Sequence, residues 1–276
     1  MNKPLILDGK KVAEELYSKL PNMNGKELAI ITIGEDKASK VYVRNKMKAC
    51  EKVGLKGVNY RFDENISKQE LENEIETILE SHNLAGIMVQ HPIPKHLEGI
   101  ENRIYPPLDV DGIGDYNMYR TLNSKEPVHY PATPKGIITL LDYYNIPIEG
   151  KNVVIIGRSD IVGKPLAAMM TARNATVTLC HSKTNNIYLK FLTRHADIII
   201  SAVGKPKYLN SEYITGGEWI NNPIIIDVGI NRDENGKLCG DVDFDDVLPY
   251  VSAITPVPGG VGPMTVLSLI LNCCDL

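Results

Sequence analysis

Short apolar runs alternate with helix-like segments along most of this chain, and this alternation constrains the fold more than any other feature. Leu28–Ile33 is an apolar run ended by Gly34, as expected of a buried strand. Further strands are predicted at residues 58–62, 85–90, 152–156, 175–180, 196–202 and 223–228. Strands that alternate with helices form parallel βαβ units, so the sequence predicts an α/β fold with an open sheet.

Helices are predicted at residues 37–53, 67–81, 133–144, 161–171 and 263–274. Ser67 and Glu70 have the spacing of a capping box at the start of the second helix. Pro134 suits the first turn of the third helix, where its missing N–H costs nothing. Residues 105–134 are rich in Pro, Gly, Asp and Tyr, so we expect a long irregular connection of the kind that often carries function.

Composition excludes several classes of protein. With 276 residues, of which 43% are hydrophobic and 23% charged, the chain is expected to be globular with about two domains. A net charge of −4 argues against a nucleic-acid or membrane-surface binder, and the apolar runs are too short to span a bilayer. Five cysteines without a Cys-x-x-Cys pair argue against a disulfide framework or a zinc site. We therefore expect a reduced cytoplasmic protein without a metal.

The strongest local signal is the turn that follows the predicted strand 152–156. Gly157 and Gly163 flank this turn, just before a predicted helix. Glycines let the backbone approach a pyrophosphate at the helix N-terminus. The spacing is Gly-x5-Gly, which only half meets the G-x-G-x-x-G fingerprint, so an ordinary tight turn remains the alternative.

The end of the next strand indicates which dinucleotide is bound. NAD sites usually place an acidic residue there to hold the ribose 2′-hydroxyl. This chain instead has His181, Ser182 and Lys183, and Arg158 is close in the preceding turn. A cationic, hydroxyl-bearing pocket suits a 2′-phosphate, so NADP is favoured over NAD. The alternative is a solvated lysine beside a surface serine.

One helix face carries a second candidate site. Ser39, Tyr42 and Lys46 are spaced i, i+3 and i+7, so they share a face of the predicted helix 37–53. Short-chain dehydrogenases also use a tyrosine and a lysine one turn apart, but after the dinucleotide turn rather than before it. Taken alone, this face is more simply a solvated helix surface.

Three loops add chemistry. Gln90 and His91 follow a predicted parallel strand, where ligands bind. Asp109 and Asp111 can bind a metal, hold a polar ring or form a turn, although a calcium loop needs more oxygen ligands. Residues 256–265 are dense in glycine and suit a phosphate or a flat ligand, but they lack the lysine of a P-loop.

Together these segments resemble the bifunctional methylenetetrahydrofolate dehydrogenase/methenyltetrahydrofolate cyclohydrolase family over nearly the whole chain. The similar stretches occur in the family's order, at Ala38–Lys46, Val89–Pro94, Asp109–Gly112, Pro131–Gly136, Gly157–Gly163, Asp227–Ile230 and Pro256–Thr265.

The resemblance implies two domains around a cleft. Residues 1–134 with the C-terminal helix 263–276 would form a folate-binding α/β domain, and residues 135–262 a Rossmann-like NADP-binding domain. It also implies a homodimer. The implied reactions are NADP-dependent oxidation of 5,10-methylenetetrahydrofolate to 5,10-methenyltetrahydrofolate, then hydrolysis to 10-formyltetrahydrofolate.

The resemblance also implies residue roles. Lys46 would be the catalytic lysine, Gln90 its hydrogen-bond partner, Asp111 the residue that holds the pterin, and Tyr42 a residue that stacks near it. The implied folate-binding set is Ser39, Tyr42, Lys46, Val89, Gln90, His91, Asp111, Pro258, Gly259, Gly260, Val261 and Gly262. The implied NADP-binding set is Gly157, Arg158, Ser159, Val162, Gly163, Ser182 and Ile230.

The chain departs from the family's usual residues at four positions. The family usually has Leu at His91, Lys at Leu108, Cys at Ala132 and His at Gly114. We expect His91 to affect the pH profile of the hydrolytic step.

Two rival interpretations remain. A shikimate-dehydrogenase-like enzyme would also have two domains and a functional lysine, but it does not account for the segment 256–265. A non-catalytic NADP-binding regulator would leave Lys46 and Asp111 without a role.

Overall fold

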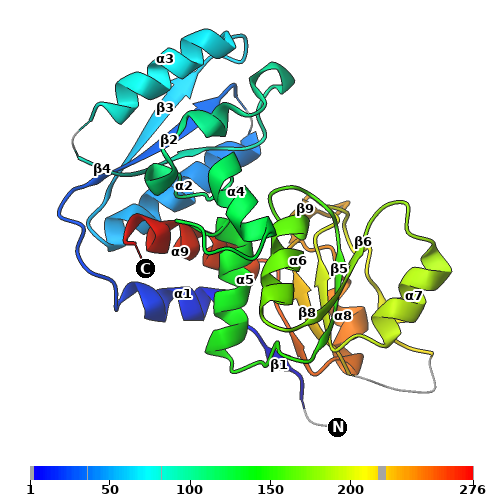
Figure 1. Ribbon diagram of the computed structural model, residues 1–276. Coiled ribbons are helices and arrows are strands. Elements are labelled where there is room, and N and C mark those ends of the chain that lie inside the picture. Colours follow the sequence, from blue (N-terminus) through cyan, green and yellow to red (C-terminus); the bar gives the residue numbers. More distant parts are fainter. Residues whose placement is uncertain (1–2, 36, 82, 217–221, 276) are drawn as a thin grey trace. The chain divides into compact units, whose positions relative to one another are not determined.

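The computed structural model describes residues 3–35, 37–81, 83–216 and 222–275, which form two compact units (Figure 1). The three-stranded unit comprises Glu15–Ala132 and Val266–Leu276, and the six-stranded unit comprises Met1–Glu14 and Thr133–Thr265. Each unit therefore combines two separate stretches of the chain. The chain passes from one unit to the other in or beside three helices, which are α1 (Gly9–Tyr17), α5 (Ala132–Tyr143) and α9 (Val261–Cys273).

The three-stranded unit is built on a parallel sheet. Its strand order is β3-β2-β4, with bounds β2 (Glu27–Ile33), β3 (Lys56–Phe62) and β4 (Leu84–Val89). Helix α2 (Lys37–Lys52) connects the first two strands, and α3 (Lys68–Leu79) connects the second and third. Ser67 caps α3 with the predicted capping box, since its side chain accepts from Glu70 N and the Glu70 side chain accepts from Ser67 N. The predicted strands and helices of this part are confirmed.

A hydrophobic core fills the space between this sheet and α3. Ala29, Ile31 and Ile33 alternate along β2 toward one face, and Leu71, Ile75 and Ile78 of α3 contribute to the same cluster. Leu97, Ile100 and Ile104 extend the cluster into the segment after β4. This segment forms the short 3-10 helices η1 (Lys95–Leu97), η2 (Ile100–Arg103) and η3 (Pro106–Leu108). The core thus anchors the connection that carries Asp109 and Asp111.

The C-terminal part of α9 holds the same connection from another side. Asn272 is 1% exposed. Its Nδ2 donates to the backbone oxygens of Val110, at 2.8 Å, and Tyr130, at 3.1 Å. The expectation of a long irregular connection at residues 105–134 is wrong in part, because helix α4 (Asp115–Leu122) lies within it. Asn117 of α4 joins the network by donating to the Asp109 carboxylate.

The six-stranded unit has a parallel sheet of order β1-β11-β8-β7-β5-β6. The strands are β1 (Leu5–Ile6), β5 (Asn152–Ile156), β6 (Thr176–Cys180), β7 (Ile198–Ser201), β8 (Ile224–Asp227) and β11 (Ala253–Ile254). The four longer strands confirm the predicted ones. Strand β5 has β6 on one side and β7 on the other, so the chain reverses its direction of winding there.

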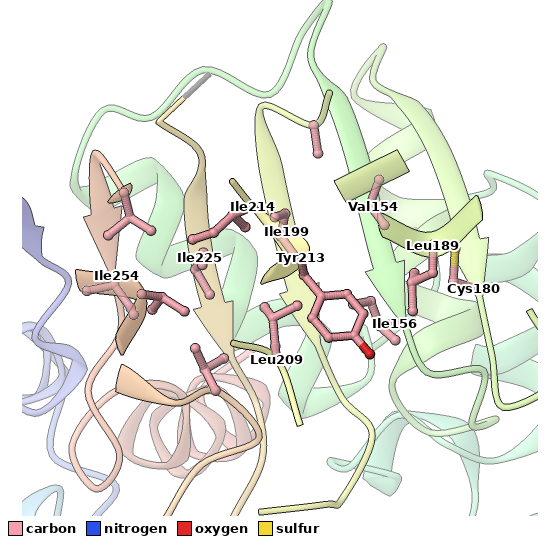
Figure 2. Close-up of a cluster of buried hydrophobic side chains, with 14 residues drawn as sticks. Val154, Ile156, Cys180, Leu189, Ile199, Leu209, Tyr213, Ile214, Ile225 and Ile254 are labelled. Atoms are coloured by element: carbon pink, nitrogen blue, oxygen red, sulfur yellow. The ribbon is translucent and has the colours of Figure 1, made fainter. Parts of the chain in front are cut away.

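Alternate residues of these strands build a core on one face of the sheet. Val154 and Ile156 of β5 point to the same side as Ile199, Ile225 and Ile254 (Figure 2). Helix α7 (Asn186–Arg194), the 3-10 helix η4 (Ser211–Tyr213) and α8 (Phe244–Val247) contribute to the cover of this face. Helix α6 (Gly163–Ala172) contacts β5 and β6. The remaining elements are the antiparallel hairpin of β9 (Asn231–Arg232) and β10 (Leu238–Cys239), and the 3-10 helix η5 (Leu248–Tyr250).

The first fourteen residues belong to the six-stranded unit. The sequence instead predicts them in the same domain as residues 15–134. Leu5 and Ile6 of β1 pair with Ala253 and Ile254 of β11, so this segment completes the six-stranded sheet. A two-residue strand has no periodicity that sequence analysis can detect. Across the described part of the chain, the structure contains no helix with the length and apolarity needed to cross a membrane.

Asn272→Ala is expected to lower the free energy of unfolding by about 2 kcal/mol, because two buried backbone oxygens each lose a donor. Chemical denaturation measures this change. Asn123→Ala is the matched control, since the Asn123 amide also donates to a backbone oxygen but on an exposed helix end. Equal losses of stability in the two variants would contradict an anchoring role for Asn272.

Candidate active site

A buried lysine lies at the centre of the candidate site in the three-stranded unit. Lys46 is only 8% exposed, on the face of α2 that turns toward the sheet. Its Nζ donates to Gln90 Oε1 at 2.9 Å and lies 3.2 Å from Met88 Sδ. Burial lowers the pKa of Lys46, while the nearby negative charge of Asp111 opposes this shift. The amine is therefore poised to be neutral more readily than a surface lysine.

Gln90 is held in place by the sheet. It follows the last residue of β4, and its backbone N donates to Ile31 O of β2 at 2.8 Å. Its side-chain Nε2 donates to His91 O at 2.8 Å. Because the amide nitrogen is engaged there, the amide oxygen faces Lys46. Gln90 thus presents an acceptor to the lysine in a fixed orientation.

The two aspartates of the 109–111 segment have different surroundings. Asp109 is buried, and its carboxylate accepts from Gly112 N, Gly114 N and Asn117 Nδ2. These bonds give Asp109 a role in folding the turn. Asp111 is half-buried, and loss of hydration raises its pKa, while the positive charges of Lys46 and His91 oppose the rise. Asp111 is therefore the carboxyl group that faces the candidate site.

His91 brings a further charged pair to the site. Its Nε2 lies 2.5 Å from Glu101 Oε1. The hydrogen bond to Glu101 is the largest cause of a raised pKa for His91. Glu101 lies in η2 and is 7% exposed. Sequence analysis missed Glu101, because ten residues and an irregular segment separate it from His91.

The other predicted folate-binding residues of this unit are less uniform. Tyr42 and Ser39 are half-buried on the same helix, and partial burial raises the pKa of Tyr42. Val89 is 1% exposed and belongs to the hydrophobic core. Its side chain therefore supports the strand end. Among the described residues, His, Cys, Asp and Glu side chains do not come together in groups of three that could hold a metal ion.

The predicted dinucleotide turn lies at the carboxyl end of β5, in the six-stranded unit. A Cβ at Gly163 would lie 2.0 Å from Gly157 O, and a Cβ at Gly157 would lie 2.2 Å from Ala202 O. Ser159 Oγ accepts from Val162 N and Gly163 N, which closes the turn at the start of α6. Only glycine permits this close approach of backbone segments, and the turn precedes a helix N-terminus. The residues present fit a bound dinucleotide.

The predicted 2′-phosphate residues extend from neighbouring strand ends. Gly157 N donates to Cys180 O at 2.9 Å, so the first turn and the end of β6 are adjacent. Arg158, Ser182 and Lys183 follow these ends and are exposed. The acidic residue typical of an NAD site is replaced by this cationic and hydroxyl-bearing group.

A pair of buried aspartates organises the loops that carry Ile230. Asp227, at the end of β8, accepts from Gly229 N, Asp241 N and Val242 N. Asp241 accepts from three successive backbone N–H groups, those of residues 203, 204 and 205, and from Asn231 Nδ2. Sequence analysis identified the segment 227–230 but missed Asp241, which lies in an irregular connection without a recognisable pattern.

The glycine-rich segment 256–262 lies in the same unit. Lys10 N donates to Gly259 O at 2.8 Å, which ties this segment to α1. A Cβ at Gly262 would lie 3.7 Å from Ile230 Cδ1, so the segment runs beside Ile230. Pro258 is exposed, whereas Gly260 and Val261 are buried.

Two family models match the chain. The catalytic domain of tetrahydrofolate dehydrogenase/cyclohydrolase matches residues 7–111, and the NAD(P)-binding domain of the same enzymes matches residues 131–276. The chain belongs to the tetrahydrofolate dehydrogenase/cyclohydrolase family. Curated relatives named bifunctional protein FolD include one from Lachnoclostridium phytofermentans, 45% identical over 98% of this chain and 96% of the relative. Another, from Bacillus anthracis, is 46% identical with the same coverage.

Solved structures of the family are also similar. The bifunctional enzyme FolD from Campylobacter jejuni has a TM-score of 0.91 and 42% identity, covering 98% of this chain and 96% of that one. A Trypanosoma brucei enzyme solved with NADP and an inhibitor has a TM-score of 0.90 and 31% identity, covering 100% and 97%. Shikimate dehydrogenase from Aquifex aeolicus has a TM-score of 0.53 at 14% identity over 92% of each chain, which shows a shared fold alone.

These comparisons confirm the predicted family, the two-domain α/β class, the NADP cofactor and the pairing of dehydrogenase with cyclohydrolase activity. The chain carries both the catalytic and the NAD(P)-binding domain. It is a bifunctional dehydrogenase and cyclohydrolase of one-carbon folate metabolism, and the rival shikimate-dehydrogenase-like and regulatory interpretations are set aside.

Gly163→Ala is expected to weaken NADP binding by about tenfold, a loss of about 1.4 kcal/mol, because the turn that approaches the pyrophosphate must shift. The added Cβ would meet Gly157 O, which is backbone and must move. A fluorescence titration with NADPH measures the affinity. Gly150→Ala is the control: Gly150, unlike Gly163, has a positive φ, so alanine strains the backbone there, but its Cβ would meet open space. If Gly163→Ala bound NADPH with unchanged affinity, this turn would not be part of the cofactor site.

Proposed function

We propose that Lys46 is the general base of the cyclohydrolase reaction, in which 5,10-methenyltetrahydrofolate is hydrolysed to 10-formyltetrahydrofolate. One observation carries this proposal: the amine of Lys46 is buried, has a lowered pKa, and is held by the Gln90 amide oxygen at 2.9 Å. A base must be neutral to accept a proton, and burial favours the neutral amine. The methenyl substrate is a cation, so its approach would push the amine further toward neutrality.

The reaction needs water to lose a proton as it attacks the methenyl carbon. Neutral Lys46 would accept that proton directly or through a second water. Gln90 would keep the amine aimed at the reacting carbon, because its own amide is fixed by His91 O. Asp111 would accept hydrogen bonds from the polar edge of the pterin, and Tyr42 and Ser39 would line the ring. Pro258, Gly259, Gly260, Val261 and Gly262 would approach the folate through their backbone.

The dehydrogenase reaction makes a different demand on the protein. NADP, when bound, accepts a hydride from the methylene carbon of the substrate. This transfer needs orientation more than acid–base help. Gly157, Ser159, Val162 and Gly163 would hold the pyrophosphate by backbone groups. Arg158 and Ser182 would hold the 2′-phosphate, and the backbone at Ile230 would contact the nicotinamide.

We further propose that the three-stranded unit is the folate domain and the six-stranded unit the NADP domain. The matched domain families support this assignment, because they divide the chain between residues 111 and 131. A homodimer in the cytoplasm completes the proposal. It rests on the family resemblance, and the five cysteines, all free thiols, are compatible with a reducing compartment.

Lys46→Met is expected to lower the cyclohydrolase rate about a hundred- to ten-thousand-fold, the range of general-base catalysis. Dehydrogenase activity should fall much less, so methenyl product should accumulate. Methionine keeps the length and apolar stem of the side chain but removes the amine. The measurement is the two initial rates taken separately, corrected for spontaneous hydrolysis of the methenyl substrate.

Lys48→Met is the matched control for this experiment, because Lys48 lies on the same helix but is exposed. A thermal melt checks that both variants fold. If Lys46→Met reduced both rates equally, the lysine would be a positioning group and the proposed division between the two reactions would be wrong.

The double variant Arg158→Ala, Ser182→Asp should erode the preference for NADP over NAD. It removes the cationic side chain and installs the acidic residue that reads a ribose 2′-hydroxyl. The ratio of kcat/KM for the two cofactors measures the preference, and Arg173→Ala is a control at an exposed arginine of the same unit. If the variant kept the wild-type ratio, residues other than Arg158 and Ser182 would have to bind the 2′-phosphate.

A further inference from the structure

His91 and Glu101 form an ion pair at the edge of the candidate active site that the proposed mechanism does not use. His91 Nε2 and Glu101 Oε1 are 2.5 Å apart. The Glu101 side chain is 10% exposed and that of His91 is 32% exposed. A carboxylate this deeply buried is stable only when it is paired. The pair therefore pins the loop after β4 to η2.

The same loop connects this pair to the lysine. The carbonyl oxygen of His91 accepts from Gln90 Nε2 at 2.8 Å, and Gln90 Oε1 accepts from Lys46 Nζ at 2.9 Å. The side chain of His91 thus fixes a backbone oxygen that orients the Gln90 amide, and this amide orients the lysine. A chain of three contacts leads from Glu101 to the amine of Lys46.

We propose that His91 and Glu101 are positioning residues for the cyclohydrolase step, which fix Gln90 against Lys46 and place an imidazolium beside the lysine. This inference rests on the proposed role of Lys46. The basic side chain of His91, which is paired with the Glu101 carboxylate, would then lie near the proposed general base Lys46.

The charges that face His91 come from three other elements. Glu101 of η2 and Asp111, which follows η3, raise the pKa of His91. Lys46 of α2 and burial lower it. The hydrogen bond to Glu101 is the largest cause, so the pKa of His91 is raised overall. Lys68 of α3 acts on Glu101. With His91 protonated, the His91–Glu101 pair is neutral overall, and Asp111 is left to balance either protonated Lys46 or a cationic substrate.

The sign of the effect on Lys46 follows from this arrangement. A positive charge beside an amine disfavours its protonated form. The imidazolium therefore helps to keep Lys46 neutral, and its loss should raise the pKa of Lys46. The cyclohydrolase rate depends on the neutral amine, so its rise with pH should move to higher pH when His91 loses its charge.

The test compares His91→Gln and His91→Leu with the wild-type enzyme over a range of pH, with the two activities measured separately. Glutamine can still donate to Glu101 but carries no charge. In His91→Gln, the rise of the cyclohydrolase rate with pH should move to higher pH by about half to one unit. At pH values below the pKa of Lys46, this corresponds to a rate about three- to tenfold lower than in the wild type. His91→Leu should show the same shift and a lower plateau, because Glu101 loses its partner and the loop that carries Gln90 is no longer anchored to η2.

Two readouts separate this role from simple loss of structure. The pH profile of the dehydrogenase reaction should keep its shape in both variants. An NMR titration measures the pKa of His91, whose signal is assigned because it is absent from the His91→Gln spectrum. Glu101→Gln should lower this pKa. Glu72→Gln is the matched control, since Glu72 is 8% exposed and also holds an ion pair, at 2.8 Å from Arg103. His96→Gln controls for an exposed histidine of the same segment.

If the wild type has both activities and His91→Gln leaves the cyclohydrolase pH profile unshifted, this inference is wrong, whereas the proposed function still holds. Equal shifts in Glu72→Gln would overturn it too, since loss of any buried pair would then suffice. A wild-type enzyme without cyclohydrolase activity would instead contradict the proposed function.

Discussion

Parallel strand pairing is the constraint on which the rest of this structure depends. Parallel strands require crossover connections, so all carboxyl ends of a sheet lie at one edge, and the loops that leave this edge are neighbours. In one unit this brings Gln90, after β4, next to the end of β2 through the bond from Gln90 N to Ile31 O. In the other, Gly157 N and Cys180 O join the ends of β5 and β6. Both candidate sites begin at such a pair of strand ends.

The two sites use different physical means. In the three-stranded unit, titratable side chains share a buried region, and Lys46, Asp111, His91 and Glu101 influence one another's protonation. Isolated ions there would cost several kcal/mol each, so their charges persist only as balanced pairs. The dinucleotide turn of the six-stranded unit relies instead on glycines and backbone N–H groups, which do not titrate. The groups with shifted pKa values around Lys46 and the glycine turn therefore lie in separate parts of the chain.

Features that depend on nearby residues were predictable from the sequence. The capping box of Ser67 and Glu70 and the strand Asn152–Ile156 are local patterns, and the structure has both. Features that depend on distant residues were not. The residue pattern alone did not distinguish Asp109, which folds its own turn, from Asp111, which faces Lys46, because the difference lies in donors from Gly114 and Asn117. Only the family resemblance pointed to Asp111. Glu101 and Asp241 were missed for the same reason, since their partners come from other elements.

The interleaved make-up of the two units has a consequence for biosynthesis. The six-stranded sheet needs Leu5–Ile6 to pair with Ala253–Ile254, and the three-stranded unit needs Asn272 to hold the backbone at Val110 and Tyr130. In each case one partner is made long after the other. Neither unit can form all of its contacts before residues 253–272 have been made, and contacts of such long sequence separation form slowly. The nascent chain therefore carries an incomplete six-stranded sheet until Ala253–Ile254 emerge, and in this period its unpaired strand edges are open to pairing with other chains.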